Sequence, residues 1–220
     1  EEKAPELATD AFLLCLSAKS ESALKAYAKN YAERIQNAGS LEEVAALCTA
    51  TVINKPKLNY RISIAGNSQE ELQENLRIFY EEGDQVPLAK LSGEAKVVFI
   101  FPGQGSQWVG MGKELYQSEP VFKSTIDACE AAFAKYTDWS LIEQLHAAKE
   151  ESRLKEIDII QPSLFAIEIA LAKLWMSKGI MPDAVVGHSM GEVASAFIAG
   201  AIDLNDAANI ICSRSKLMKT

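Results

Sequence analysis

The stretch PDAVVGHSMGEVASAFIAG, residues 182–200, places Ser189 between two glycines at the point where a strand pattern gives way to a helix pattern. A β-prone run precedes the serine, and apolar residues recur at helical spacing after it, namely Met190, Val193, Ala194, Phe197 and Ile198. A turn this tight requires neighbours without side chains, which Gly187 and Gly191 supply, and it leaves the serine on a strained elbow. The pattern predicts a nucleophile beside a helix N-terminus, whose N–H groups suit a developing oxyanion. The alternative is a glycine-flanked turn whose serine has no catalytic role.

The composition is typical of a soluble globular protein, with 48% hydrophobic and 24% charged residues in a chain of 220. The most apolar helical stretch, residues 164–175, carries Glu168 and Lys173, so we expect no membrane span. The net charge of −8 comes without a basic cluster, which argues against a nucleic-acid partner. Small molecules or other proteins are the expected partners.

The cysteines and histidines predict neither a zinc site nor a disulfide framework. The four cysteines are far apart, and the chain has only two histidines. We therefore expect free thiols and a cytoplasmic location. The sequence starts without Met and without a secretory signal, and its last helical pattern, residues 210–220, has no stop signal. We expect a piece of a longer polypeptide.

A cluster of glycine, proline and charged residues at 82–94 predicts a boundary between two domains, residues 1–93 and 94–220. In the first domain, strand patterns occur at 12–16 and 58–65 and a helix pattern at 24–35. The spacing S-x-x-E at Ser40 and at Ser68 predicts helices that start near Leu41 and Gln69. The first domain is therefore expected to be a small mixed α/β module.

The second domain alternates strand and helix patterns, which favours a mostly parallel α/β sheet. Its first strand, residues 96–101, is a continuous apolar run of the kind that a parallel sheet buries on both faces. Helix patterns follow at 121–135, 141–146 and 163–178, and after the elbow a last helix is opened by Asp203.

A second glycine-rich turn, FPGQGSQWVG at residues 101–110, follows the first of these strands. It lacks the glycines of a dinucleotide-binding fingerprint and of a phosphate loop. A serine hydrolase-like site needs a second backbone N–H donor from such a loop, paired with the amide of the residue after the nucleophile. Gln104, supported by Gly103 and Gly105, and Met190 fit those two places. A turn rich in glycine only for packing is the alternative.

Arg214 lies on an otherwise apolar helical stripe that it shares with Ala207, Ile211 and Met218. Its planar fork suits bidentate capture of a carboxylate, which a substrate could supply. A structural ion pair with one of the 30 acidic residues, or a snorkelling side chain, is equally compatible with the sequence. Neither His188, next to the serine on a strand end, nor His146, in a polar helix, is suitably placed to act as its general base.

Three strings together resemble the acyltransferase domain of modular type I polyketide synthases and the related malonyl transferases: FPGQGSQWVGMG at 101–112, QPSLFAIEIALAKLW at 161–175 and VVGHSMGE at 185–192. The resemblance covers about the last 125 residues, and the first ninety or so resemble the ketosynthase-to-acyltransferase linker domain. It implies an α/β-hydrolase-like core after a small mixed α/β linker domain.

By this resemblance Ser189 carries the acyl group as an ester, and the amides of Gln104 and Met190 form the oxyanion hole. Arg214 binds the free carboxylate of a malonyl-type extender unit. The implied reaction is ping-pong: acyl-CoA acylates the serine, and the phosphopantetheine thiol of an acyl carrier protein then takes the acyl group. No metal or bound cofactor is implied. The adjacent ketosynthase domain and the remainder of the acyltransferase domain are the other implied partners.

The catalytic histidine and the ferredoxin-like subdomain of the family lie beyond the serine, past the point where this sequence ends at Thr220. We therefore expect these 220 residues alone to be inactive. For the extender unit, the apolar Met190 favours malonyl, whereas residues 157–161 (IDIIQ) resemble a string associated with methylmalonyl. We favour malonyl as the substrate. Two other functions stay open: an α/β-hydrolase-type serine esterase, and a non-catalytic scaffold fragment of a megasynthase.

Overall fold

The computed structural model describes residues 11–82, 89–90 and 96–219. They fall into two compact units, one on each side of residues 91–95. The predicted boundary between residues 93 and 94 lies outside the described residues. Each unit has its own hydrophobic core, and the two are described separately below.

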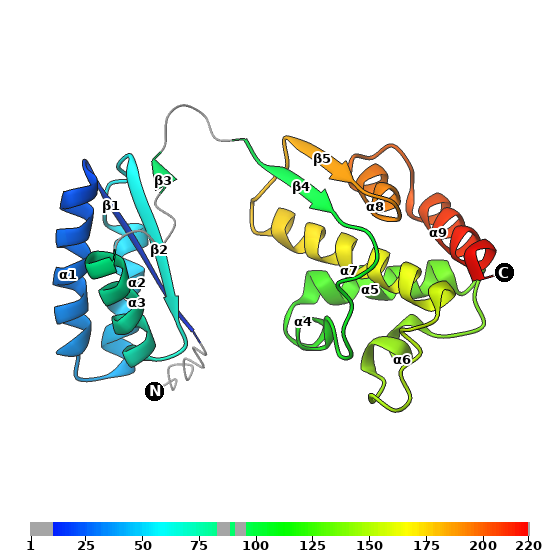
Figure 1. Cartoon of the computed structure of the whole chain (residues 1–220), viewed down its shortest axis with the longest axis horizontal. Coiled ribbons are helices and arrows are strands. Elements are labelled where there is room, and N and C mark those ends of the chain that lie inside the picture. Colours follow the sequence, from blue (N-terminus) through cyan, green and yellow to red (C-terminus); the bar gives the residue numbers. More distant parts are fainter. Residues whose placement is uncertain (1–10, 83–88, 91–95, 220) are drawn as a thin grey trace, which may run out of the picture. The chain divides into compact units, whose positions relative to one another are not determined.

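In its described residues the first unit is a three-stranded antiparallel sheet with three helices (Figure 1). Its elements in chain order are β1 (Phe12–Ala18), α1 (Glu21–Gln36), α2 (Leu41–Ile53), β2 (Tyr60–Gly66), α3 (Gln69–Glu82) and β3 (Ala89–Lys90). The strands are ordered β1-β2-β3, and Phe12 pairs with Gly66 at one end of the β1–β2 ladder. Every second residue of β1, beginning with Phe12, is buried, so one face of the sheet packs on the helices.

The two predicted capping boxes set the starts of α2 and α3. The Ser40 hydroxyl accepts a hydrogen bond from the Glu43 amide (3.3 Å), and the Glu43 carboxylate accepts one from the amide before the cap (2.9 Å). Ser68 and Glu71 repeat the arrangement at α3, with distances of 3.1 and 2.8 Å. Both helices therefore start at the predicted residues, because the side chains satisfy amides that the first helical turn leaves free.

The second unit is an α/β unit with a parallel strand pair, as the sequence predicts (Figure 1). Its elements are β4 (Val98–Phe101), α4 (Lys113–Ser118), α5 (Pro120–Phe133), α6 (Leu141–His146), α7 (Ile157–Ser177), β5 (Ala184–Gly187), α8 (Gly191–Ile198) and α9 (Leu204–Lys219). The pairing of β4 with β5 runs from Val98 with Ala184 to Phe101 with Gly187. Asp203 caps α9 as predicted, since its carboxylate accepts from the Asp206 amide at 2.9 Å.

The predicted start of α7 at Ser163 is wrong, since the helix begins six residues earlier, at Ile157. The predicted helical pattern began just after Pro162, and proline is favoured in the first turn of a helix because it supplies no N–H to the helical ladder. Here it lies in the second turn, where it costs one hydrogen bond. The burial of Ile159 and Ile160 ahead of it offsets this cost and carries the helix through the proline.

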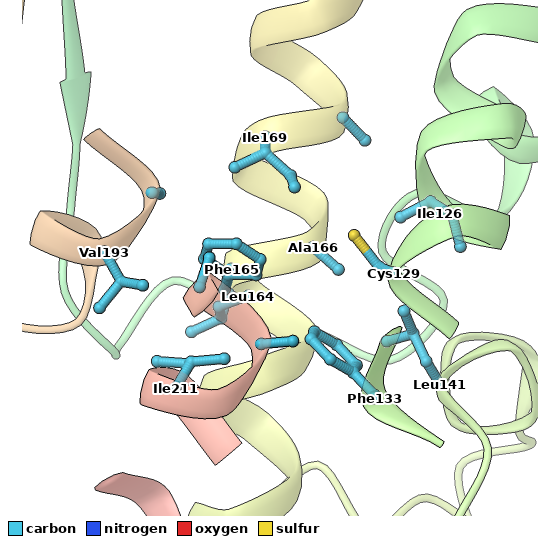
Figure 2. Packing of buried hydrophobic residues seen from close by; sticks show 14 of the residues in the cluster. Ile126, Cys129, Phe133, Leu141, Leu164, Phe165, Ala166, Ile169, Val193 and Ile211 are labelled. Carbon is cyan, nitrogen blue, oxygen red and sulfur yellow. The ribbon is translucent and has the colours of Figure 1, made fainter. Parts of the chain in front are cut away.

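Helix α7 forms the centre of the second unit's core. Figure 2 shows Phe165, Ala166 and Ile169 of this helix facing residues of α5, α8 and α9. The ring of Phe165 lies 6.2 Å from Phe133 in α5 and 6.4 Å from Phe197 in α8, measured between centroids. This core fixes α7, α8 and α9 against one another; α7 and α9 carry side chains of the candidate site, and Ser189 lies in the turn just before α8.

One face of the β4–β5 pair is buried on this core and the other is open. Phe99, Phe101 and Val185 face inward, whereas Ile100 is 73% exposed and Val186 53% exposed. Parallel sheets are ordinarily covered on both faces. The open face of this pair therefore exposes apolar side chains that such a sheet would usually bury. Within the described ranges no helix is both long and apolar enough to cross a membrane.

Candidate functional site

Ser189 occupies the turn between β5 and α8. Strand β5 ends at Gly187 and α8 begins at Gly191, which leaves three residues for the reversal. Ser189 has a φ of 55°, and it is the one non-glycine residue in the described part of the chain with a positive φ. This conformation is costly for a residue with a side chain and is concentrated at functional sites. The Ser189 side chain is exposed, as the elbow prediction requires.

The two flanking glycines are required by close packing. A Cβ on Gly187 would lie 2.5 Å from the Gly191 carbonyl oxygen, and a Cβ on Gly191 would lie 2.2 Å from the Phe101 carbonyl oxygen. Neither distance leaves room for a methyl group. The first turn of α8 therefore rests directly on the backbone at the end of β4.

The loop after β4 passes beside the elbow. A Cβ on Gly103 would lie 3.5 Å from the Ser189 Cβ, and Gly105 adopts a φ of 145°, which favours glycine. Gln104 lies between them on this loop. Among the described residues, no acceptor hydrogen-bonds to the amide of Gln104 or of Met190. One of these free N–H groups directly follows Ser189 and the other belongs to the loop that passes beside it, and an oxyanion hole requires free donors of this kind.

Arg214 reaches the serine from α9. Its Nη2 donates to Ser189 Oγ at 3.0 Å, and its Nη1 donates to the side-chain oxygen of Gln161 in α7. None of the acidic side chains that the structure describes forms an ion pair with Arg214, so the structural ion pair considered above is not found. The half-buried cation contacts only neutral groups, which leaves its charge available to an anionic ligand.

The two histidines and the two buried cysteines of the second unit are not placed as an alternative nucleophile or base. Neither imidazole hydrogen-bonds to Ser189: His146 Nδ1 lies 2.8 Å from the Ile142 carbonyl, and the His188 ring is exposed against Gly103. All four cysteines are free, and burial raises the pKa of Cys129 and of Cys212 to about 12, so these two thiols are unreactive. No group of three metal-ligating side chains occurs in the part of the chain described.

Gln161 is the site residue that the sequence reasoning did not identify. Its side chain is only 3% exposed and contacts Arg214, Gln104 and Met218. The signal was a polar residue directly before Pro162 in a strongly apolar helix, where an amide needs a specific partner.

Glu168 of α7 is a second polar residue in apolar surroundings. It lines a groove of about 550 Å³ between β4 and α7, with Leu164, Trp175 and Ile180 among its neighbours. Burial raises the pKa of Glu168 to about 8, and its Oε2 has no hydrogen-bond partner within the described ranges. The carboxyl is therefore mostly protonated at neutral pH.

Residues 98–220 match the family described as the acyl transferase domain, and the chain belongs to that family. Residues 12–76 match a second family, described as CurL-like, PKS C-terminal. Together the two matches identify an acyltransferase region of the kind found in modular type I polyketide synthases.

Two curated relatives are large synthases. The mycoketide-CoA synthase of Mycobacterium tuberculosis is 42% identical over 207 residues, and the erythronolide synthase EryA2 of Saccharopolyspora erythraea is 38% identical over 212. The alignments cover 92% and 94% of this chain but only 5% and 6% of the relatives. The comparison therefore concerns one region of each synthase.

Solved structures give the same family. The acyltransferase domain from module 8 of the salinomycin polyketide synthase has a TM-score of 0.81 and 36% identity. The acyltransferase domain of SpnD, in complex with 2-(pent-4-yn-1-yl)malonyl, has a TM-score of 0.81 and 30% identity. The matches cover 96% and 94% of this chain and 50% and 49% of those chains, so this chain spans about half of each domain structure.

Proposed function

We propose that this chain provides the nucleophile and the carboxylate-binding arginine of a malonyl-type acyltransferase site. The observation that carries the proposal is the cation of Arg214, which lies 3.0 Å from Ser189 Oγ and has no ion-pair partner among the described acidic groups. An ester pocket for neutral substrates has no need of such a charge, because a desolvated cation is costly without an anion. This disfavours the serine-esterase alternative.

In the proposed reaction Ser189 Oγ attacks the thioester carbonyl of an acyl-CoA. The Oγ–carbon bond forms, the carbon–sulfur bond breaks, and the hydroxyl proton passes through a general base to the CoA sulfur. The amides of Gln104 and Met190 would stabilise the negative charge that develops on the carbonyl oxygen. In the second half the phosphopantetheine thiol of an acyl carrier protein attacks the seryl ester and releases the serine. This chemistry calls for no metal and no bound cofactor.

Neither histidine of this chain is placed to act as the general base. His146 and His188 are the two histidines of the sequence, and neither hydrogen-bonds to Ser189. We propose that the remainder of an acyltransferase domain supplies a histidine base, and that this chain alone does not turn over. The exposed apolar side chains of Ile100 and Val186 are consistent with a surface that further parts of such a domain cover.

For the acyl group we propose malonyl, with methylmalonyl as the competing extender. The solved SpnD acyltransferase domain in complex with a substituted malonyl group supports a malonyl-type substrate for the family. Met190, directly after the nucleophile, has a fully buried side chain. Acyl-CoA, an acyl carrier protein and an adjacent ketosynthase domain are the proposed partners, and the first unit is the proposed linker to the ketosynthase.

The test uses a complete acyltransferase domain that contains this sequence. Malonyl-CoA should add one malonyl group to the domain, detected by intact-protein mass spectrometry, and Ser189→Ala should abolish the addition. The domain should load malonyl-CoA in preference to hydrolysing p-nitrophenyl acetate, whereas an esterase would show the reverse. Unchanged product formation by a synthase that carries Ser189→Ala would support a scaffold role instead. Efficient transfer to a carrier protein by the 220 residues alone would contradict the missing base.

A further inference from the structure

We propose that Gln161 is a positioning residue that holds Arg214 toward the substrate carboxylate and couples it to the loop of Gln104. The proposal rests on the proposed function of Ser189 and Arg214. It assigns a specificity role to a side chain whose hydrogen bonds go to Arg214, Gln104 and Met218 and not to Ser189.

The contacts of Gln161 link three elements around Ser189. Its side-chain oxygen accepts from Arg214 Nη1 of α9, and its Nε2 lies 3.4 Å from Gln104 Oε1 in the loop after β4. The same Nε2 lies 3.6 Å from the sulfur of Met218, one turn beyond Arg214. At 3% exposure the amide is fixed by these partners and not by solvent.

The chemistry of the partners sets the orientation of the amide. Arginine only donates hydrogen bonds, so the carbonyl oxygen of Gln161 must face Arg214 and its NH₂ group must face the other way. The NH₂ group then requires an acceptor, which the side-chain oxygen of Gln104 provides. The guanidinium therefore determines, through Gln161, how the side chain of Gln104 is turned.

Neutrality is the second property that matters. Gln161 fixes one edge of the guanidinium without supplying a negative charge, and the hydroxyl of Ser189 is equally neutral. A carboxylate in place of the amide would keep the acceptor and form an ion pair in a buried place, where such pairs are strong. That ion pair would compete with a malonyl carboxylate. The amide thus positions the cation and leaves its charge for the substrate.

Two variants of Gln161 and one control separate positioning from support of the fold. Gln161→Met keeps the length and loses the acceptor, whereas Gln161→Glu keeps the acceptor and adds the competing charge. Ser163→Ala is the matched control, because the Ser163 hydroxyl is also fully buried in α7 and donates only to the Ile159 carbonyl (2.8 Å).

Rates of malonyl and acetyl loading are measured for each variant of a complete acyltransferase domain. Gln161→Met should lower kcat/KM for malonyl-CoA about tenfold, the loss of one charge-assisted hydrogen bond, and should lower acetyl loading less. Gln161→Glu should lower the malonyl-to-acetyl ratio further than Gln161→Met. Ser163→Ala should leave the ratio unchanged. If both Gln161 variants reduce malonyl and acetyl loading equally, as a general loss of structure would, the positioning role is refuted.

The 220-residue chain gives an independent readout by ¹⁵N NMR of its arginine side chains. Rotation of the Arg214 guanidinium about its Cζ–Nη bonds should be slower in the native chain than in Gln161→Met, and Ser163→Ala should match the native rate. Equal rates in all three chains would refute the positioning role. Arg214→Ala in the loading assay separates the two proposals: an unchanged malonyl preference would refute the carboxylate role of Arg214 itself, whereas a lost preference with unaffected Gln161 variants would refute only the role of Gln161.

Discussion

Replacement of Gly191 by alanine should destabilise the second unit severely. The new Cβ would lie 2.2 Å from the Phe101 carbonyl oxygen and 2.5 Å from that of Pro102, where ordinary contacts begin at 3.4 Å. The backbone of β4 or of α8 would have to move by more than 1 Å. The same Phe101 oxygen accepts the His188 amide at 3.0 Å, so the movement also disturbs a hydrogen bond of the elbow. We expect a loss of about 3 kcal/mol in the free energy of unfolding.

Tryptophan fluorescence in urea measures this loss in the relevant unit alone. The three tryptophans of the chain, Trp108, Trp139 and Trp175, all lie in the second unit. With a slope of about 2 kcal/mol per molar urea, the unfolding midpoint of Gly191→Ala should fall by about 1.5 M. Gly39→Ala in the first unit is the control, because its Cβ would meet only Glu43 Oε2 at 3.8 Å. A Gly191→Ala midpoint equal to that of the native chain would refute the close packing of α8 on β4.

Three further results are expected. Arg214→Ala should reduce malonyl loading of a complete domain at least tenfold and shift its preference toward acetyl, since no cation would offset desolvation of the carboxylate; competition between the two CoA esters checks it. Glu168→Gln should stabilise the second unit by about 1 to 3 kcal/mol at pH 8 and have little effect at pH 4. The folded pKa of Glu168 is about 8, above its unfolded value of 4.5. The native chain therefore loses stability as the pH rises from 4.5 to 8, and the glutamine variant does not. Urea midpoints measured across this pH range check the prediction. Phe165→Ala should cost about 3 to 5 kcal/mol in the same unfolding assay, because its fully buried ring packs against Phe133 and Phe197 at the centre of the core.

The features that local sequence determines were predicted well. The starts of α2 and α3 follow from two serine–glutamate pairs, and the elbow follows from the two glycines around Ser189. The steric need for Gly187 is local in sequence, whereas that for Gly191 comes from the backbone of Phe101 and Pro102. The parallel sheet could be predicted because a buried strand pattern recurs between helices. The capping signals lie within a few residues of the helix starts that they specify, whereas the sheet was inferred from the alternation of patterns along the whole unit.

Features that depend on partners distant in the chain were predicted less well. The start of α7 was placed too late because the helical pattern was predicted only from Ser163 onward, whereas the burial that extends the helix through Pro162 is tertiary. The sequence placed Arg214 on an inward face but left its partner open, and Gln161 lies 53 residues away from it. No pattern within one helix indicates which buried amide meets which cation, because that pairing is fixed only when α7 and α9 pack.

The backbone conformation of Ser189 costs stability, whereas the function proposed above needs its hydroxyl. A side chain at a φ of 55° costs about 1 kcal/mol that glycine would not pay, so Ser189→Gly should relieve strain at the elbow as it removes the hydroxyl. Selection for folding alone would then favour the inert residue at this position. The hydroxyl that the proposed function requires opposes this gain in stability, because glycine has no side-chain oxygen.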